Sequence, residues 1–377
     1  MSQTSQSATE RVVFLDYLRA FACLMVIVVH SGEFFYIGAE HPVTIAGSDG
    51  VWVAIFNSLM RSAVPLFVMT SSYLLFPVRS DTPSFLKRRF TRVGIPFVVW
   101  LVLYAVLPQV GGEWSAATVC ETLKALCFNF PPAAGHLWFV YMLLGLYILM
   151  PMISAWVAGL SKRGERIFIA VWALTTFVPY LRYASRALGL GGYLYGEGLW
   201  NEFSLFGYVS GYVGYLVIAH YIRTYVDLSW RKTLAFALPA FAVGFAVTAG
   251  WFYGLAMSVA PDADGMIFGS EQLLHDIEIS WRFCTPNVAL MSVAVFLVFK
   301  KITRSEGWVY KVAGELSRMS YGMYLMHIFV LNAVFALLGG RVATCIAIPL
   351  VGIVTYAAAY LVTKALSCLP KSRYLIG

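Results

Sequence analysis

The first apolar run of the sequence contains ionisable side chains that a helix would place on one face. The run FLDYLRAFACLMVIVVHSGEFF holds Asp16, Arg19, His30 and Glu33. His30 is eleven positions after Arg19, a step that at about 100° per residue returns a helix to the same face. A histidine can accept a proton near neutral pH, and an arginine can bind an anion. The spacing therefore predicts an anion-binding group and a proton acceptor ~16 Å apart along one polar path.

Two interpretations of this first helix remain open from the sequence. Ionisable residues inside a membrane usually face the interior of a helix bundle and mark functional sites. Alternatively, Asp16 pairs with Arg19 near one interface. In that case Glu33 lies at the other interface, and His30 only hydrogen-bonds a neighbouring helix. If the face is functional, Glu33 is better placed than Asp16 to orient the imidazole, because it follows His30 by three residues.

Basic residues crowd the start of the third apolar segment. The stretch FLKRRFTRVGIP holds Lys87, Arg88, Arg89 and Arg92. Arg89 and Arg92 are three residues apart and are therefore neighbours on a helix. Two guanidinium groups suit phosphate oxygens, which they bind through paired hydrogen bonds. The alternative is that these charges only orient the chain in the membrane or contact anionic lipid.

Further polar side chains inside or beside the apolar segments are candidates for lining a site. They are Arg61, Ser71, Ser72, His136, Trp138, Tyr321 and His327. Arg61 and Ser72 are again eleven residues apart, so one continuous helix would place them on a shared face. A satisfied buried histidine explains His327 as well as a catalytic role does. The histidines and cysteines lack the spacing of metal ligands, and we expect no metal site.

The composition places these residues in a membrane protein. The 377 residues are 60% hydrophobic and 12% charged, whereas a soluble domain carries about 25% charged residues. Apolar runs long enough to cross a ~30 Å hydrocarbon core recur along the chain. They lie at 12–35, 51–76, 93–109, 137–159, 166–182, 203–224, 233–256, 283–300, 321–339 and 343–365. We expect an all-α, polytopic transmembrane bundle of about ten helices over residues 11–366, between a disordered polar N-terminus (1–10) and a short cytoplasmic tail (367–377).

The distribution of charge predicts how the bundle is oriented. Most of the 27 Lys and Arg residues lie in alternate loops, and acidic residues gather in the opposite loop at 262–278. Loops rich in Lys and Arg face the cytoplasm. Both termini are therefore expected on the cytoplasmic side, which requires an even number of crossings. The net charge of +8 then reflects membrane orientation, and we expect no nucleic-acid partner.

Taken together, these motifs resemble the acyltransferase-3 family of bacterial membrane enzymes that O-acylate carbohydrates. Arg19 and His30 match the family's arginine and histidine with ten residues between them. Arg89 and Arg92 match its Arg-x-x-Arg at the start of helix three. Three further stretches, 64–74, 136–151 and 317–327, are also similar. Ser72 stands where the family has glycine, a difference expected to narrow or reshape the site.

The resemblance implies a donor, an acceptor and a location. Members move an acyl group, most often acetyl, from cytoplasmic acyl-coenzyme A to a carbohydrate hydroxyl in the bacterial cytoplasmic membrane. Here it suggests that Arg88, Arg89 and Arg92 hold the phosphates of acetyl-CoA or another acyl-CoA. The thioester then passes Arg19 to reach His30. His30 either removes the hydroxyl proton or carries the acyl group transiently, and the sequence leaves both routes open.

The acceptor and a competing function also follow from this comparison. His136 and Trp138, at the outer start of the fourth helix, are expected to stack against a carbohydrate or lipid-linked sugar. The identity of that sugar, the choice of acetyl or succinyl, and the oligomeric state stay open. A secondary transporter or exporter is the rival function, because buried charges also suit a proton-coupled carrier in the lipid bilayer. Against it, the apolar runs show no paired halves, and the charges cluster in the first three helices.

Overall fold

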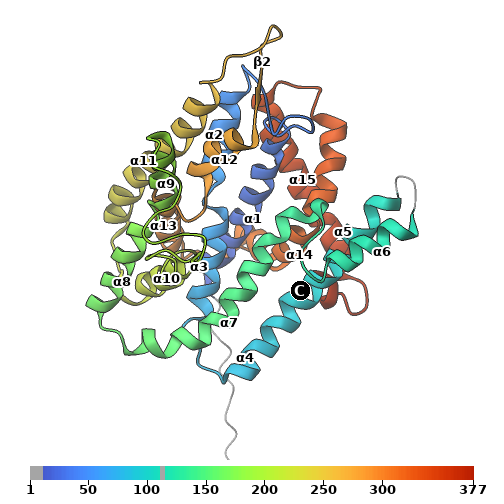
Figure 1. Cartoon of the computed structure of the whole chain (residues 1–377). Helices are drawn as coiled ribbons and strands as arrows, with labels where there is room; N and C mark the ends of the chain where they lie inside the picture. Colours follow the sequence, from blue (N-terminus) through green and yellow to red (C-terminus); the bar gives the residue numbers. More distant parts are fainter. Residues whose placement is uncertain (1–11, 111–114) are drawn as a thin grey trace, which may run out of the picture.

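The computed structural model describes residues 12–110 and 115–377, and these residues are mostly helical (Figure 1). The segment 1–10, predicted to be disordered, lies outside the described residues. The first part of the chain forms α1 (Val13–Glu33), β1 (Val43–Ala46), α2 (Gly50–Met60), α3 (Ala63–Leu75), α4 (Thr82–Arg89), the π-helix η1 (Phe90–Gly94), α5 (Ile95–Val110), α6 (Ala116–Ala125), the 3₁₀-helix η2 (Pro132–Leu137) and α7 (Trp138–Gly159). The second part forms α8 (Lys162–Thr175), α9 (Val178–Ala187), α10 (Val213–Tyr225), α11 (Trp230–Ala256), β2 (Met266–Gly269), α12 (Glu271–Ile277), the 3₁₀-helix η3 (Glu278–Trp281), α13 (Pro286–Lys300), α14 (Gly307–Leu338), α15 (Thr344–Ser367) and α16 (Arg373–Ile376).

Within the described residues, nine helical segments are long and apolar enough to cross a membrane. They run over Val13–Glu33, Gly50–Leu75, Thr82–Leu107, Pro132–Gly159, Lys162–Ala187, Trp230–Ala256, Glu271–Phe299, Gly307–Leu338 and Thr344–Ser367. Each overlaps one of the predicted apolar runs. The chain is therefore an all-α, multi-pass membrane protein, as the sequence predicted.

The one remaining predicted run, 203–224, forms a shorter helix than expected. Residues 203–212 are in turns, and α10 begins only at Val213. Its 13 residues span about 20 Å, less than the ~30 Å hydrocarbon core. One face of α10 is buried against α3 and α8. This segment therefore lies inside the bundle and does not form a full-length spanning helix.

Helix α1 lies at the centre of the bundle, in contact with α2, α3, α13, α14 and α15 (Figure 1). Its side chains are buried on nearly every side, with Leu18 and Ile27 fully enclosed. Gly352 of α15 permits a close approach, because a Cβ there would lie 2.7 Å from a methyl carbon of Val28. Beside that contact, Ser31 Oγ donates to the carbonyl of Ile348 at 2.9 Å. Ionisable residues on α1 are thus held in the interior of the protein.

The second spanning segment is broken at Arg61, which changes an expectation from the sequence. Helix α2 ends at Met60 and α3 begins at Ala63. Pro65 explains the break, since its ring would clash with the carbonyl four residues earlier and it has no N–H to donate. Arg61 and Ser72 therefore do not share the face of one continuous helix. Ser72 Oγ instead donates to the carbonyl of Leu216 in α10 at 2.7 Å.

The third spanning segment also departs from regular α-helix, between Phe90 and Gly94. Pro96 follows this π-turn and again removes one backbone donor, which accounts for the irregular turn. The Tyr321 hydroxyl donates to the carbonyl of Val93 at 2.7 Å. The C-terminal tail returns to the same place, where Trp100 Nε1 donates to the carbonyl of Leu375 at 2.8 Å.

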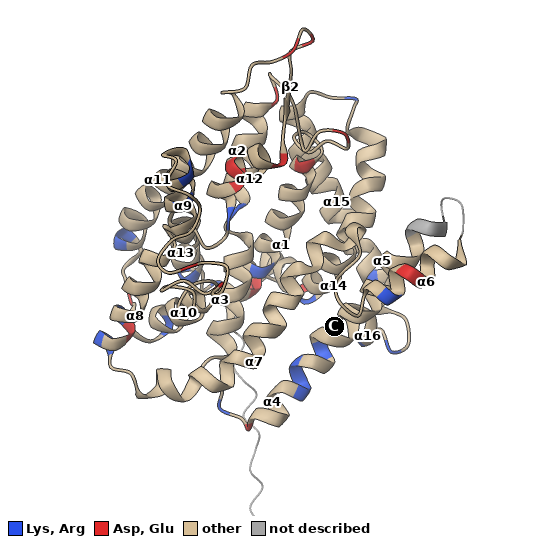
Figure 2. Cartoon of the chain, in the orientation of Figure 1, with Lys and Arg blue, Asp and Glu red and all other residues tan. Residues whose placement is uncertain are grey.

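Charge and secondary structure differ between the two ends of the bundle. Basic residues mark α4 at the lower end of Figure 2, whereas the loop between α11 and β2 at the upper end is acidic. At the upper end, β1 and β2 form a two-stranded antiparallel ribbon in which Val43 pairs with Gly269. We refer to the end that carries α4 as the basic end. The positive-inside rule predicts that it faces the cytoplasm.

Candidate active site

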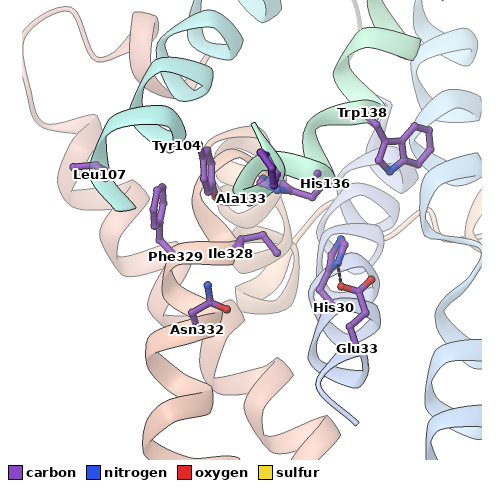
Figure 3. Close-up of a pocket in the computed structure, with 12 residues that line it drawn as sticks. His30, Glu33, Tyr104, Leu107, Ala133, His136, Trp138, Ile328, Phe329 and Asn332 are labelled. Carbon is purple, nitrogen blue, oxygen red and sulfur yellow. Dashed lines mark hydrogen bonds and ion pairs between the residues drawn. The ribbon is translucent and has the colours of Figure 1, made fainter. Parts of the chain in front are cut away.

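A cavity of about 770 Å³ opens beside the end of α1 that lies away from the basic end. Helices α1, α5 and α14 form its walls together with η2 (Figure 3). Its lining comprises His30, Glu33, Tyr104, Leu107, Pro132, Ala133, Gly135, His136, Trp138, Ile328, Phe329 and Asn332. The cavity brings together four of the residues that the sequence singled out, from two helices and the turn between α6 and α7.

His30 and Glu33 form a hydrogen-bonded pair at the C-terminal end of α1 (Figure 3). Nδ1 of His30 lies 2.9 Å from Oε2 of Glu33, and the two side chains are 18% and 34% exposed. Because a carboxylate only accepts hydrogen bonds, Nδ1 is the donor, and Nε2 of a neutral ring is left to accept a proton. Glu33 is thus the carboxylate that orients His30, as its position three residues later predicted.

Two more imidazole rings surround His30. The ring centroid of His327 lies 5.2 Å from that of His30, and the centroid of His136 lies 4.9 Å from His327 and 6.4 Å from His30. His327 Nδ1 contacts the carbonyl of Tyr324 at 2.6 Å, while its Nε2 has no hydrogen-bond partner among the described residues. Such a cluster is suited to moving protons within an enclosed site. In the part of the chain that the structure describes, no three His, Cys, Asp or Glu side chains are placed to hold a metal ion.

The turn η2 places His136 above His30. Pro132 begins this 3₁₀ turn, which ends at Leu137, and α7 starts at the next residue, Trp138. The Tyr324 hydroxyl donates to the backbone carbonyl of His136 and fixes the turn on α14. The His136 side chain is only 6% exposed, and neither ring nitrogen makes a hydrogen bond of normal geometry to the described residues. His136 therefore forms part of the wall, and Trp138 is the more accessible of the two residues expected to meet a sugar.

A smaller cavity of about 100 Å³ adjoins the first and extends it between α1, α3 and α7. His30, Glu33, His136 and Trp138 line both cavities, and Arg61 lines only the smaller one. Arg61 lies at the break between α2 and α3, which turns its side chain into the bundle. We call His30, His136 and His327 the histidine group. The structure therefore places a buried guanidinium next to this group.

A second group of site candidates gathers nearer the basic end. Arg19 of α1 interacts electrostatically with Arg89 and Arg92 and with the hydroxyl of Tyr147 in α7. Ser71 of α3 also lies within hydrogen-bonding range of that hydroxyl. Three guanidinium groups within electrostatic range of one another, with Asp16 as the carboxylate that also acts on Arg19, leave an excess of positive charge that suits a phosphate-bearing ligand. The prediction that Arg19 and the Arg-x-x-Arg pair lie along one path is consistent with this arrangement.

We call Arg19, Arg89 and Arg92 the arginine group. Three aromatic rings lie between the histidine group and the arginine group. Phe67 and Phe139 have ring centroids 6.0 Å apart, and Phe139 and Tyr324 have centroids 5.6 Å apart. All three line the inner wall of the smaller cavity, whose lining does not reach Arg19. We call these residues the aromatic layer. The smaller cavity therefore ends at these rings, which lie across the predicted passage from Arg19 to His30.

Nine of the fourteen predicted site residues line neither cavity. Besides His327, Arg19, Arg89, Arg92 and Ser71, they are Asp16, Arg88, Ser72 and Tyr321. Oδ1 of Asp16 accepts from Ser317 Oγ at 2.9 Å, so this carboxylate ties α1 to α14 and does not orient His30. Arg88 Nη2 donates to Ser80 Oγ at 2.7 Å on the exposed side of α4. Ser72 is fully buried against α10. Tyr321 lies beside Tyr147 and the π-turn, near the arginine group.

Sequence reasoning missed several residues that line the cavities or the arginine group. Tyr104 and Phe329 stack with centroids 4.1 Å apart in the cavity wall, and Asn332 faces the same space (Figure 3). Asn332 could have been found as an amide within an apolar run. Tyr104 and Tyr147 are two of 22 tyrosines and carry no distinguishing local signal.

The chain was compared with known protein families, curated proteins and solved structures. A family model described as an acyltransferase domain matches residues 12–364. No curated protein and no solved structure matches the chain. The match begins one residue before α1 and ends within α15, so it includes both the histidine group and the arginine group.

Proposed function

Because this chain belongs to the acyltransferase-3 family, we propose that it moves an acyl group from acyl-coenzyme A to a hydroxyl of a cell-envelope or exported carbohydrate. The observation that carries the proposal is the His30–Glu33 pair on the wall of the 770 Å³ cavity. That cavity is large enough for a sugar, and ligand sites of this kind commonly measure about 300–1,000 Å³. The acyl group is most simply acetyl, with succinyl as the alternative, and the membrane is the bacterial cytoplasmic membrane.

His30 supplies the base for this reaction. Its Nε2 takes the proton from the acceptor hydroxyl while Glu33 stabilises the resulting imidazolium through Nδ1. The hydroxyl oxygen forms a bond to the thioester carbon, and the bond from that carbon to sulfur then breaks. The proton on His30 passes to the leaving thiolate, so the histidine returns to its neutral form. The alternative is an acyl group carried on Nε2, with coenzyme A leaving before the acceptor attacks.

Arg89 and Arg92 are the proposed contacts for the donor's phosphates, with Arg19 further along the path. Both guanidiniums lie at the basic end, where a cytoplasmic donor would enter. Arg88 is a weaker candidate, because its guanidinium is engaged by Ser80 on the exposed face of α4. The thioester must then cross the aromatic layer to reach His30, so we propose that Phe67 and Phe139 move aside when the donor binds.

The test is acyl transfer by the purified full-length protein in lipid nanodiscs. Acetyl-CoA labelled in the acetyl group is incubated with carbohydrate and glycolipid from the envelope of the source cells. The wild-type protein should move label to that fraction, and His30→Ala should not. The assay is repeated with labelled succinyl-CoA, and label that stays in both donors with the folded wild-type protein would contradict the proposal and favour a transporter. Without acceptor, label bound to the wild type and absent from His30→Ala would identify the acyl-histidine route.

A further inference from the structure

Arg61 is a buried guanidinium that the proposed transfer step does not use. It follows the last residue of α2 and is 8% exposed. Its Nη2 donates to Oδ1 of Asn57 at 2.9 Å, and its guanidinium carbon lies 4.4 Å from the ring centroid of Trp281. Gly32 of α1 makes room for Asn57, since a Cβ there would lie 2.3 Å from Nδ2 of that amide. The side chain is therefore held in one place by neutral groups.

Among residues 12–110 and 115–377, no carboxylate forms a direct ion pair with Arg61. The two nearby acids are engaged elsewhere, since Glu33 pairs with His30 and Glu278 accepts from the Tyr36 hydroxyl at 2.7 Å. The Nε atom of Arg61 is buried and has no hydrogen-bond partner among the described residues. Buried charges are costly unless they are paired, so an unpaired one is a strong candidate for binding an anion.

Arg61 also separates two cavities. On one side is the smaller cavity that contains His30. On the other side is a cavity of about 470 Å³, whose lining includes Arg61, Arg282, Glu278 and Phe283. Two guanidiniums against one carboxylate leave this third cavity positively charged. Arg61 and Phe283 line both cavities, so a ligand in the third cavity lies next to the space in front of His30.

Aromatic rings accompany the charge. Trp281 is 1% exposed and packs against both Phe252 and Arg61, so it holds the guanidinium and offers no face to a ligand. The half-buried ring of Phe283 lines the third cavity and stacks on Trp138 with centroids 5.6 Å apart. Flat rings beside a guanidinium form a surface on which a sugar ring can lie while an anionic substituent is bound. The neighbourhood of Arg61 thus supplies both contacts that an acidic sugar needs.

We infer that Arg61 binds an oxyanion of the carbohydrate acceptor, either a sugar carboxylate or a sugar phosphate. This inference rests on the proposed function and specifies its acceptor as an acidic sugar. The guanidinium binds the anionic group in the third cavity. The hydroxyl to be acylated then lies in the smaller cavity, in front of His30. A neutral sugar lacks this contact and leaves Arg61 buried without a counter-charge.

The test compares binding of glucuronate, glucose 1-phosphate and glucose to the full-length protein in nanodiscs, at constant ionic strength. The two anionic probes separate a carboxylate from a phosphate. At least one should bind about tenfold or more tightly than glucose, because a site with buried polar groups rejects analogues that leave them unpaired. Arg61→Gln should remove this difference, and Arg61→Lys should retain part of it because it keeps the charge without the planar geometry. Arg341→Gln, at an exposed position outside the cavities, is the matched control and should leave the difference unchanged.

Binding and catalysis are then measured separately, so that the two proposals fail in different ways. Equal binding of all three probes by a folded wild-type protein would overturn the inference about Arg61 whatever the enzymatic result. Equal loss of transfer to acidic and neutral glycosides in Arg61→Gln would also overturn it, because the guanidinium would then act on the acyl group or on the fold. Absence of transfer to any acceptor, with selective anion binding intact, would instead count against the proposed function.

Discussion

The carboxylate of Glu33 lies 2.9 Å from Nδ1 of His30, one helical turn further along the same helix. This contact fixes the tautomer and the plane of the imidazole, whose other nitrogen is left available for chemistry. Because both side chains come from α1, the pair depends little on the loops around it. The helix itself is held at the centre of the bundle by α14 and α15. A geometry supported in this way is suited to catalysis, which requires reacting groups held within narrow limits.

Replacement of Glu33 by glutamine should lower kcat with little change in KM. The amide keeps the size of the side chain but carries no charge to stabilise an imidazolium. We expect a loss of roughly 10²-fold for Glu33→Gln, and at least as much for His30→Ala, because general bases typically contribute 10²–10⁴-fold. Steady-state rates of coenzyme A release measure the effect, with gel filtration as the control for folding. A Glu33→Gln enzyme with wild-type kcat would remove the carboxylate from the mechanism.

Arg89 and Arg92 should act mainly on donor affinity. Arg89→Ala or Arg92→Ala is expected to raise the KM for acetyl-CoA about tenfold or more, since a hydrogen bond to a charged group contributes about 1.5–3 kcal/mol. Arg88→Ala offers a matched control on the same helix, because that guanidinium bonds to Ser80 and faces outward. It should raise the KM by a smaller factor. Equal effects at all three positions would indicate a general effect of positive charge, without a specific phosphate site.

The aromatic layer should control access of the thioester to His30. Phe67→Trp enlarges one of its rings and should slow transfer from succinyl-CoA more than from acetyl-CoA, because the longer acyl group needs a wider opening. Phe21→Trp is the control, at a ring that is 36% exposed on the outer side of α1. Rates with both donors give the ratio for each variant. An unchanged ratio in a folded Phe67→Trp protein would show that the donor reaches His30 by another route.

Much of this arrangement was predictable because it depends on local periodicity. The lengths of the apolar runs predicted ten spanning segments, nine of which are long apolar helices in the described residues, and the helical repeat placed His30 and Glu33 on one face. The histidine group was less accessible to sequence reasoning. Its rings come from α1, η2 and α14, and contacts between residues more than a hundred positions apart leave no local pattern. Pro65 is a sequence signal for the break at Arg61. Because the segment was treated as one continuous helix, Arg61 was placed on the same face as Ser72, which the structure does not show.

Ser72 should affect stability more than specificity. The sequence comparison suggested that a serine in place of glycine would reshape the site, yet Ser72 lies in neither cavity next to His30 and bonds to the carbonyl of Leu216. Ser72→Gly removes this bond and adds a glycine to α3, so we expect a loss of about 1–2 kcal/mol in the free energy of unfolding. Thermal unfolding in detergent measures the loss. The ratio of acetyl to succinyl transfer should stay constant, and a changed ratio would return Ser72 to the site.

His136 offers a test that separates function from folding. Its ring is buried and neither nitrogen makes a hydrogen bond of normal geometry to the described residues. A buried polar group without a partner costs about 1–3 kcal/mol, so a ring of similar shape that has no such group should be tolerated or stabilising. We therefore expect His136→Phe to unfold at the same or a higher temperature than the wild type. If the imidazole passes protons between His30 and the cavity, the same variant loses transfer activity although its fold is intact. Full activity in His136→Phe would reduce this histidine to part of the cavity wall. A lower unfolding temperature would mean that a ring nitrogen is bonded by water or by the carbonyl of Leu325.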